Sequence, residues 1–178
     1  MRIHLPWLGQ GDIFGEVPVI GAELDPAGNV HAYSSPGPAV LLTHDCAMDK
    51  PDKATGLPRV ERLQFARLRE ITALSPDRQA NLRGAAKKVG PFEALYLDEI
   101  PQFGETFMLL TDPYYLPARY FDLTLLAHGD HPEAESQSAI YTTPRRHDTR
   151  IGRIDAEQLD LLRQKMLAHW TRFDLDQS

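Results

Sequence analysis

A compact apolar run at residues 38–42 (PAVLL) stops abruptly at four polar residues, Thr43, His44, Asp45 and Cys46. Consecutive apolar residues bounded by Gly or Pro on one side and by charge on the other are typical of a central strand whose two faces are both covered. We therefore expect a buried strand at residues 38–43. Its reactive side chains are predicted to lie where the strand leaves the core.

A hairpin is predicted before this strand. Residues 11–20 alternate imperfectly, with Ile13, Val17 and Val19 on one parity, which indicates a first strand after a turn. Residues 25–29 (DPAGN) are rich in turn formers, and residues 30–33 return as a second strand. Residues 34–37 contain Pro and Gly and are expected to separate this second strand from the strand at 38–43.

The middle of the chain predicts a surface loop at residues 49–58, a strand at 59–68 and one inserted helix. Ser75, Pro76 and Asp77 form a strong helix start, because Ser accepts backbone N–H groups, Pro has no donor to lose and Asp faces the positive end of the helix dipole. The helix is expected to cover residues 76–88 and to end before Gly90 and Pro91.

Three further strands are predicted at residues 92–97, 105–110 and 119–126. The proline-containing residues 111–117 are expected to form a connection or an edge, because proline cannot donate to a strand ladder. Residues 128–138 are acidic and contain Gly and Pro, which predicts a mobile loop.

The last element is predicted to be a helix at residues 155–173 that docks on the sheet. Asp155 and Gln158 have the spacing of a capping box. Apolar side chains recur every three or four residues on one stripe, which we expect to be buried: Leu159, Leu162, Met166, Trp170 and Phe173. The chain thus predicts one α+β, mostly β domain over residues 1–178, with barrel strands at about 11–127, built as a small barrel or a strongly bent antiparallel sheet.

Composition narrows the function classes. The chain has 178 residues, 42% of them hydrophobic, and its 19 Lys and Arg against 25 Asp and Glu give a net charge of −6, which argues against a basic field over the whole surface. Cys46 is the only cysteine, so an intrachain disulfide and a multi-cysteine zinc site are both excluded. No apolar run approaches a membrane span. We expect a cytoplasmic protein of a prokaryote or phage, with no metal or other cofactor.

The sequence Gly11-Asp12-Ile13, followed after the hairpin by residues 38–43 (PAVLLT), resembles the "GDI … RPAVVLS/T" opening of the MazF/PemK-like toxins, over roughly residues 11–43. The resemblance implies an SH3-like barrel, cleavage of RNA and a protein partner such as an antitoxin or a host factor. The family's Ser or Thr at the strand end is matched by Thr43. Its arginine before "PAV" is replaced here by Gly37.

Metal-independent RNA cleavage needs a base, an acid and a cation for the phosphorane charge. An imidazole such as His44 can serve as acid or base. Arginines before the last helix can supply the cation if that segment folds over the strand end. The predicted catalytic set is Thr43, His44, Asp45, Cys46, Arg150 and Arg153, and the predicted RNA- or partner-binding set is Arg145, Arg146, Tyr114 and Tyr115.

Two other functions stay open. One is a non-catalytic interaction or regulatory module that uses the same strand end and the tyrosines, since tyrosine supplies rigid contact area with a polar tip. The other is a cysteine-dependent hydrolase. In that reading Cys46 is the nucleophile and His44, two residues earlier, would lie on the same face of an extended strand.

Overall fold

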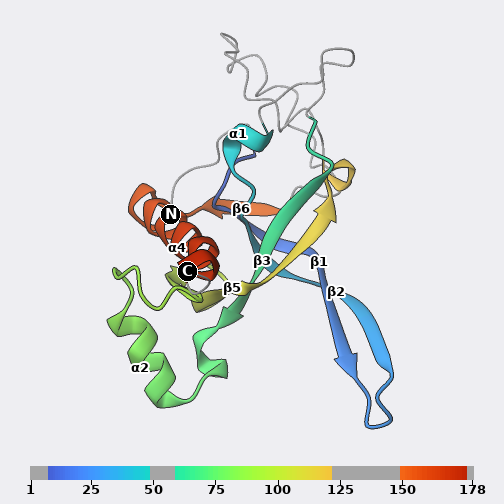
Figure 1. Cartoon of the computed structure of the whole chain (residues 1–178), viewed down its shortest axis with the longest axis horizontal. Coiled ribbons are helices and arrows are strands. Elements are labelled where there is room, and N and C mark those ends of the chain that lie inside the picture. Colours follow the sequence, from blue (N-terminus) through green and yellow to red (C-terminus); the bar gives the residue numbers. More distant parts are fainter. Residues whose placement is uncertain (1–7, 49–58, 122–148, 176–178) are drawn as a thin grey trace.

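The computed structural model describes residues 8–48, 59–121 and 149–175. These residues form one antiparallel sheet of six strands in the order β4-β5-β3-β2-β1-β6 (Figure 1). The strands are β1 (Asp12–Leu24), β2 (Val30–Leu41), β3 (Arg62–Glu70), β4 (Ala94–Ile100), β5 (Gly104–Pro117) and β6 (Arg150–Arg153). The helices are α1 (Asp45–Met48), α2 (Pro76–Gly84) and α4 (Ala156–Leu175), with two 3₁₀ turns, η1 (Ile71–Ala73) and η2 (Ala118–Tyr120).

The predicted α+β, mostly β fold is confirmed, in the form of a bent sheet. The strands β4 and β6 stand at the two ends of the order, and within the described residues they do not pair with each other. The sheet is therefore not closed into a hydrogen-bonded barrel.

The strand β2 is central, as its apolar run predicts. It pairs with β1 on one side and with β3 on the other, and residues 39–42 are all at most 2% exposed. Alternate side chains of a strand point to opposite faces. Leu41 accordingly packs in one apolar cluster with Phe14 and Phe65, and Val40 packs in a second cluster with Leu162 of α4.

The hairpin of β1 and β2 is confirmed, but the predicted break at residues 34–37 is wrong. The strand β2 runs without interruption from Val30 to Leu41, and Pro36 pairs with Pro18 of β1. Only residues 39–41 of β2 also pair with β3, so among the residues that the structure describes the outer part of β2 has a free edge, where a missing N–H group is tolerated. Asp25 forms the reversal by accepting the N–H groups of Ala27 and Asn29.

The strand β5 is longer than predicted. Residues 104–109 pair with β4, and residues 113–117 pair with β3 alone, so Pro113 and Pro117 occupy an edge stretch, one of the two positions expected for them. The prediction of a strand that begins at residue 119 is wrong, because Ala118–Tyr120 form the 3₁₀ turn η2. Residues 122–126, the predicted mobile loop at 128–138 and the predicted surface loop at 49–58 lie outside the described residues.

The helix α2 begins at Pro76 as predicted, but Ser75 makes no side-chain capping hydrogen bond and the helix ends at Gly84 instead of residue 88. The helix α4 confirms the predicted C-terminal helix, and Asp155 Oδ1 accepts the N–H group of Gln158 at its start.

The predicted buried stripe of α4 is wrong at Trp170, whereas Met166 packs against the core and the side chain of Phe173 lies outside the described residues. Among the residues of α4 whose side chains the structure describes, Leu161, Leu162 and Lys165 are buried, whereas Trp170 is 56% exposed. A hydrophobic pattern does not predict the burial of Lys165, because lysine is a charged residue. Its burial is possible because the ammonium group donates to the carbonyl oxygens of Val89 and Pro91. Within the described ranges, none of the helices has the length and apolar sequence needed to cross a membrane.

Candidate functional site at the end of β2

Four parts of the chain meet where β2 ends. Gly11 N–H donates to Leu41 O at 2.8 Å, which brings the residues before β1 alongside the end of β2. The helix α1 follows β2 directly, β6 pairs with the start of β1, and α4 contributes Arg163 through a hydrogen bond to Gln10.

Thr43 joins β2 to β3. Its hydroxyl oxygen accepts the N–H group of Gln64 at 2.7 Å, and Leu42 N–H donates to Gln64 O at 2.8 Å. The Thr43 side chain thus extends the strand pairing by one step. The hydroxyl proton is still available to donate, because accepting a hydrogen bond uses only an oxygen lone pair.

His44 and Cys46 form an exposed pair at the start of α1. The Nδ1 atom of His44 lies 3.0 Å from Cys46 Sγ and accepts the backbone N–H group of Cys46 at 3.2 Å. Acceptance by Nδ1 assigns the proton of the neutral imidazole to Nε2. The pair therefore combines a nucleophilic sulfur atom with an imidazole that can exchange a proton with a ligand.

Asp45 anchors the surrounding chain. Its Oδ1 atom accepts the N–H group of Gln10 at 2.6 Å, and its Oδ2 atom lies 3.5 Å from a terminal nitrogen of Arg163. Arg163 Nε also donates to Gln10 Oε1 at 2.9 Å, while Gln10 Nε2 donates to Leu42 O. A guanidinium group from α4, with its side chain 38% exposed, is thereby held beside α1.

Arg150 and Arg153 lie on β6 and hold Asp12. A terminal nitrogen of Arg150 is 3.2 Å from Asp12 Oδ2, and Arg153 Nε donates to Asp12 Oδ1. Gly9 N–H also donates to Asp12 Oδ2, at 2.9 Å. The side chains of Arg150 and Arg153 are only 5% and 14% exposed. Both arginines therefore neutralise a buried carboxylate at the start of β1.

The two predicted binding tyrosines, Tyr114 and Tyr115, are neighbours on β5. Tyr114 is half-buried and stacks on Phe65 with ring centroids 5.9 Å apart, and burial raises its pKa above the ordinary range. Tyr115 follows it on β5 and is exposed. Neighbouring residues of a strand point to opposite faces, so the two rings do not act together. Arg145 and Arg146 lie outside the described residues.

Sequence reasoning missed Arg163 and Gln10. Neither belongs to a motif, and Arg163 reads as an ordinary polar position of an amphipathic helix, so only the packing of α4 reveals its role. In the part of the chain that the structure describes, no three His, Cys, Asp or Glu side chains come together as a metal site. A scan against protein-family models and a search of curated proteins find no match for this chain.

Proposed function

We propose that this protein is a toxin-related domain of a prokaryotic or phage conflict system, acting in the cytoplasm, that contacts RNA at the end of β2 and cleaves it without a metal. The observation that supports the proposal most is the position of Arg163, which reaches Asp45, the residue between the exposed His44 and Cys46. A cation is thus held against the residue that directly follows the acid–base group in the chain.

The proposed reaction is attack of a ribose 2′-hydroxyl on the adjacent phosphorus. The bond between O2′ and phosphorus forms, the bond between phosphorus and O5′ breaks, and a 2′,3′-cyclic phosphate results. His44 donates its Nε2 proton to O5′, because Nδ1 accepts the N–H group of Cys46 and the proton of the neutral imidazole is therefore on Nε2. Water takes the proton of the 2′-hydroxyl group and returns a proton to the imidazole. Arg163 stabilises the negative charge that develops on the phosphorane oxygens.

The test is cleavage of a mixed-sequence RNA in the presence of EDTA. Loss of a general acid or base typically costs about 10²- to 10⁴-fold in rate, so His44→Ala is expected to reduce cleavage by that factor. Arg163→Ala is expected to reduce it strongly and Arg163→Lys to restore part of it. Thr43→Ala tests whether the hydroxyl contributes beyond its bond to Gln64.

Two variants serve as matched controls. His31 is an exposed histidine near the far end of the hairpin, and Arg78 is an exposed arginine on α2. His31→Ala and Arg78→Ala are expected to cleave like the wild type. If the wild type, shown to be folded by circular dichroism, cuts no RNA, the nuclease proposal is wrong.

A cysteine-dependent hydrolase is the second candidate, favoured by the 3.0 Å distance between His44 Nδ1 and Cys46 Sγ. In this function Cys46 Sγ forms a bond to an acyl carbon as the bond from that carbon to the leaving group breaks. His44 takes the thiol proton at Nδ1 and passes it to the leaving group, and water then hydrolyses the thioester. The variant Cys46→Ala separates the two candidates, because it abolishes hydrolase activity and leaves RNA cleavage intact. The rate of Cys46 alkylation by iodoacetamide should fall in His44→Ala only if the imidazole activates the thiol.

A non-catalytic module remains the alternative on the same surface. It predicts that RNA, or a protein partner such as an antitoxin or a host factor, is bound without turnover. Retention of RNA by the wild type with no cleavage, together with weaker retention by Arg163→Ala, would favour this function. A pull-down that compares wild type with His44→Ala would extend the test to protein partners.

A further inference from the structure

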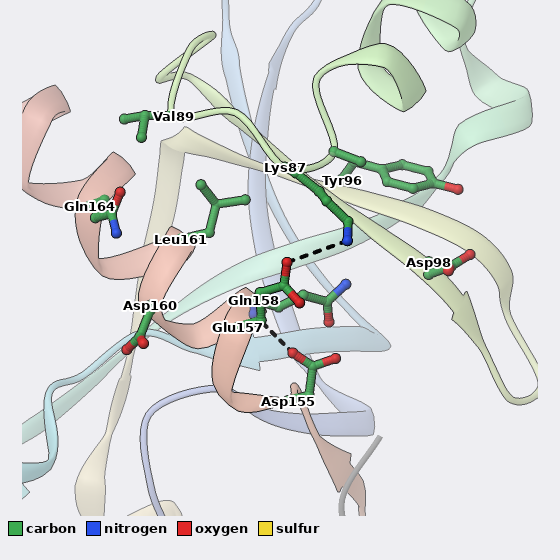
Figure 2. A pocket seen from close by; sticks show the side chains of 11 residues that line it. Lys87, Val89, Tyr96, Asp98, Asp155, Glu157, Gln158, Asp160, Leu161 and Gln164 are labelled. Carbon is green, nitrogen blue, oxygen red and sulfur yellow. Dashed lines mark hydrogen bonds and ion pairs between the residues drawn. The ribbon is translucent and has the colours of Figure 1, made fainter.

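A groove lies along the edge strand β4, built from residues outside the site at the end of β2. It consists of two adjoining cavities of about 440 and 330 Å³, which share Asp98, Asp155 and Gln158 as lining residues. Figure 2 shows the larger cavity, with Tyr96 and Asp98 of β4 on one wall and the first turns of α4 on the other. Three residues after α2, Ala86, Lys87 and Val89, line a third wall.

The groove is strongly acidic. Asp98 and Glu99 come from β4, Asp155 immediately precedes α4, and Glu157 and Asp160 come from the first turns of that helix. Among the residues that line the two cavities, Lys87 alone is a lysine or arginine, and it lies 3.4 Å from Glu157 (Figure 2). Such a lining repels nucleic acid and favours a cationic ligand.

The groove also runs along an unpaired sheet edge. Within the described residues β4 pairs with β5 only, and its register shifts between Leu97 and Glu99. At this shift Glu99 N–H donates to the carboxylate of Asp98 at 2.9 Å. An edge strand offers N–H and C=O groups to an added strand. Leu97, Ile100 and Leu161 supply the apolar part of the groove.

The charge of the groove selects among possible occupants. Two copies of this edge would place carboxylates against carboxylates, so a second copy of the chain is disfavoured. A strand with basic side chains neutralises the same carboxylates. Because side chains alternate along a strand, lysine or arginine at every second position would face one wall throughout.

We propose that this groove binds an extended, basic segment of another protein, which adds to β4 as a further strand. Main-chain hydrogen bonds to β4 would supply affinity, and the acids of the groove would select basic side chains. The partner is thus recognised by its charge pattern and its extended form. The inference does not require RNA cleavage, although one acid of the groove, Asp160, also lies 3.7 Å from a terminal nitrogen of Arg163.

The test is isothermal titration of the full chain with an octapeptide that alternates lysine and threonine and has blocked ends. The peptide is expected to bind, and its counterpart with glutamate in place of lysine is expected not to. Binding should weaken as salt is added, since exposed charges are screened. The triple variant Asp98→Asn, Glu157→Gln, Asp160→Asn is expected to lower affinity by about tenfold or more, which corresponds to about 1.4 kcal/mol.

A matched triple variant controls for net charge. Glu23→Gln, Glu61→Gln and Asp77→Asn remove the same number of charges from exposed positions outside the groove. If this triple weakens binding as much as the groove triple does, the proposed site is wrong. Asp155 is left unchanged in both variants, because it accepts the N–H group of Gln158 at the start of α4.

A second peptide tests strand addition itself. Methylation of alternate backbone nitrogens keeps the charges and removes the N–H groups that a ladder needs. The methylated peptide is expected to lose binding when the methyl groups lie on the edge that faces β4 and to keep it when they lie on the other edge. Equal binding of both methylated peptides and the parent would overturn the assignment to the edge of β4.

Discussion

Asp12 illustrates what a single residue contributes to this fold. Its carboxylate is almost fully buried and is met by Arg150, Arg153 and the N–H group of Gly9. The contacts join β1 to β6, which is separated from it by more than a hundred residues of sequence. Removing one partner of such a group leaves buried charge without compensation, which costs more than the pair itself contributes.

Asp12→Ala is therefore expected to lower the free energy of unfolding by about 3–5 kcal/mol. Equilibrium urea unfolding at neutral pH would measure the change. The control is Asp112→Ala, which removes a pair with Arg69 whose side chains are 67% and 38% exposed and should cost less than about 1 kcal/mol. Similar losses in both variants would contradict the role assigned to Asp12.

Lys165 is buried on α4, and its ammonium group donates to the carbonyl oxygens of Val89 and Pro91. Burial lowers its pKa below the ordinary value of 10.5, with a weaker opposing effect of Glu93. Between the lowered pKa and 10.5 the unfolded chain holds more protons than the folded chain, so stability rises with pH in that window.

The free energy of unfolding of the wild type minus that of Lys165→Met should accordingly increase as pH rises through this window. The expected gain is about 1.4 kcal/mol for each unit by which the pKa is lowered. Urea unfolding at a series of pH values below and up to 10.5 would measure it. A difference that stays constant over the series would show that the ammonium group is not desolvated.

The helix α2 shows how an element without a buried side chain is held. None of its residues is buried. Arg83 of α2 donates two hydrogen bonds to Glu105 of β5, and Tyr96 of β4 donates a third at 2.6 Å. These donors, Arg83 first, lower the pKa of Glu105 to about 2, while burial and then Glu105 raise that of Tyr96 to about 12.

Glu105→Gln is expected to speed amide hydrogen exchange in α2 and to leave the central strands unchanged. A depressed carboxyl pKa contributes stability that is complete above 4.5 and is lost as pH falls through about 2. Acidification over this range should therefore loosen α2 in the wild type and have little effect in the variant. Hydrogen exchange measured by mass spectrometry would report the effect of the substitution and the effect of pH. Identical protection of α2 in the two proteins would contradict the role of Glu105 in holding α2.

At the scale of the molecule, one sheet supports two apolar clusters. Phe14, Leu41 and Phe65 pack on one face, and Ile13, Val40 and Leu162 pack on the other. The strands β1, β2 and β3 supply residues to both clusters. Unfolding of these strands would therefore disrupt both clusters at once. Cooperative unfolding in a single transition is expected from this arrangement.

Leu41→Ala and Leu162→Ala test this coupling, one in each cluster. Both side chains are fully buried, and each substitution is expected to lower the unfolding free energy by about 2–5 kcal/mol. Both should shift one common transition in far-ultraviolet circular dichroism, whereas Leu24→Ala, on an exposed side chain, should shift it little. Two separate transitions in either core variant would refute cooperative unfolding.

The sequence by itself determined the elements whose signals are local. The apolar run at residues 38–42 predicted the buried end of β2, turn formers at 25–29 predicted the hairpin, and Asp155 predicted the start of α4. These features depend on side-chain periodicity and on hydrogen bonds between near neighbours. The same local signals placed Thr43, His44, Asp45 and Cys46 together at one strand end.

Tertiary structure decided everything that depends on residues far apart in the chain. It paired Arg150 and Arg153 with Asp12, brought Arg163 to Asp45 and buried Lys165 against Val89 and Pro91. It also allows β2 to continue past Pro36, because within the described residues that part of the strand pairs with β1 alone and has a free edge. A charged side chain has the same local pattern whether it faces water or a buried partner, so its partner is fixed only when the sheet and α4 pack together.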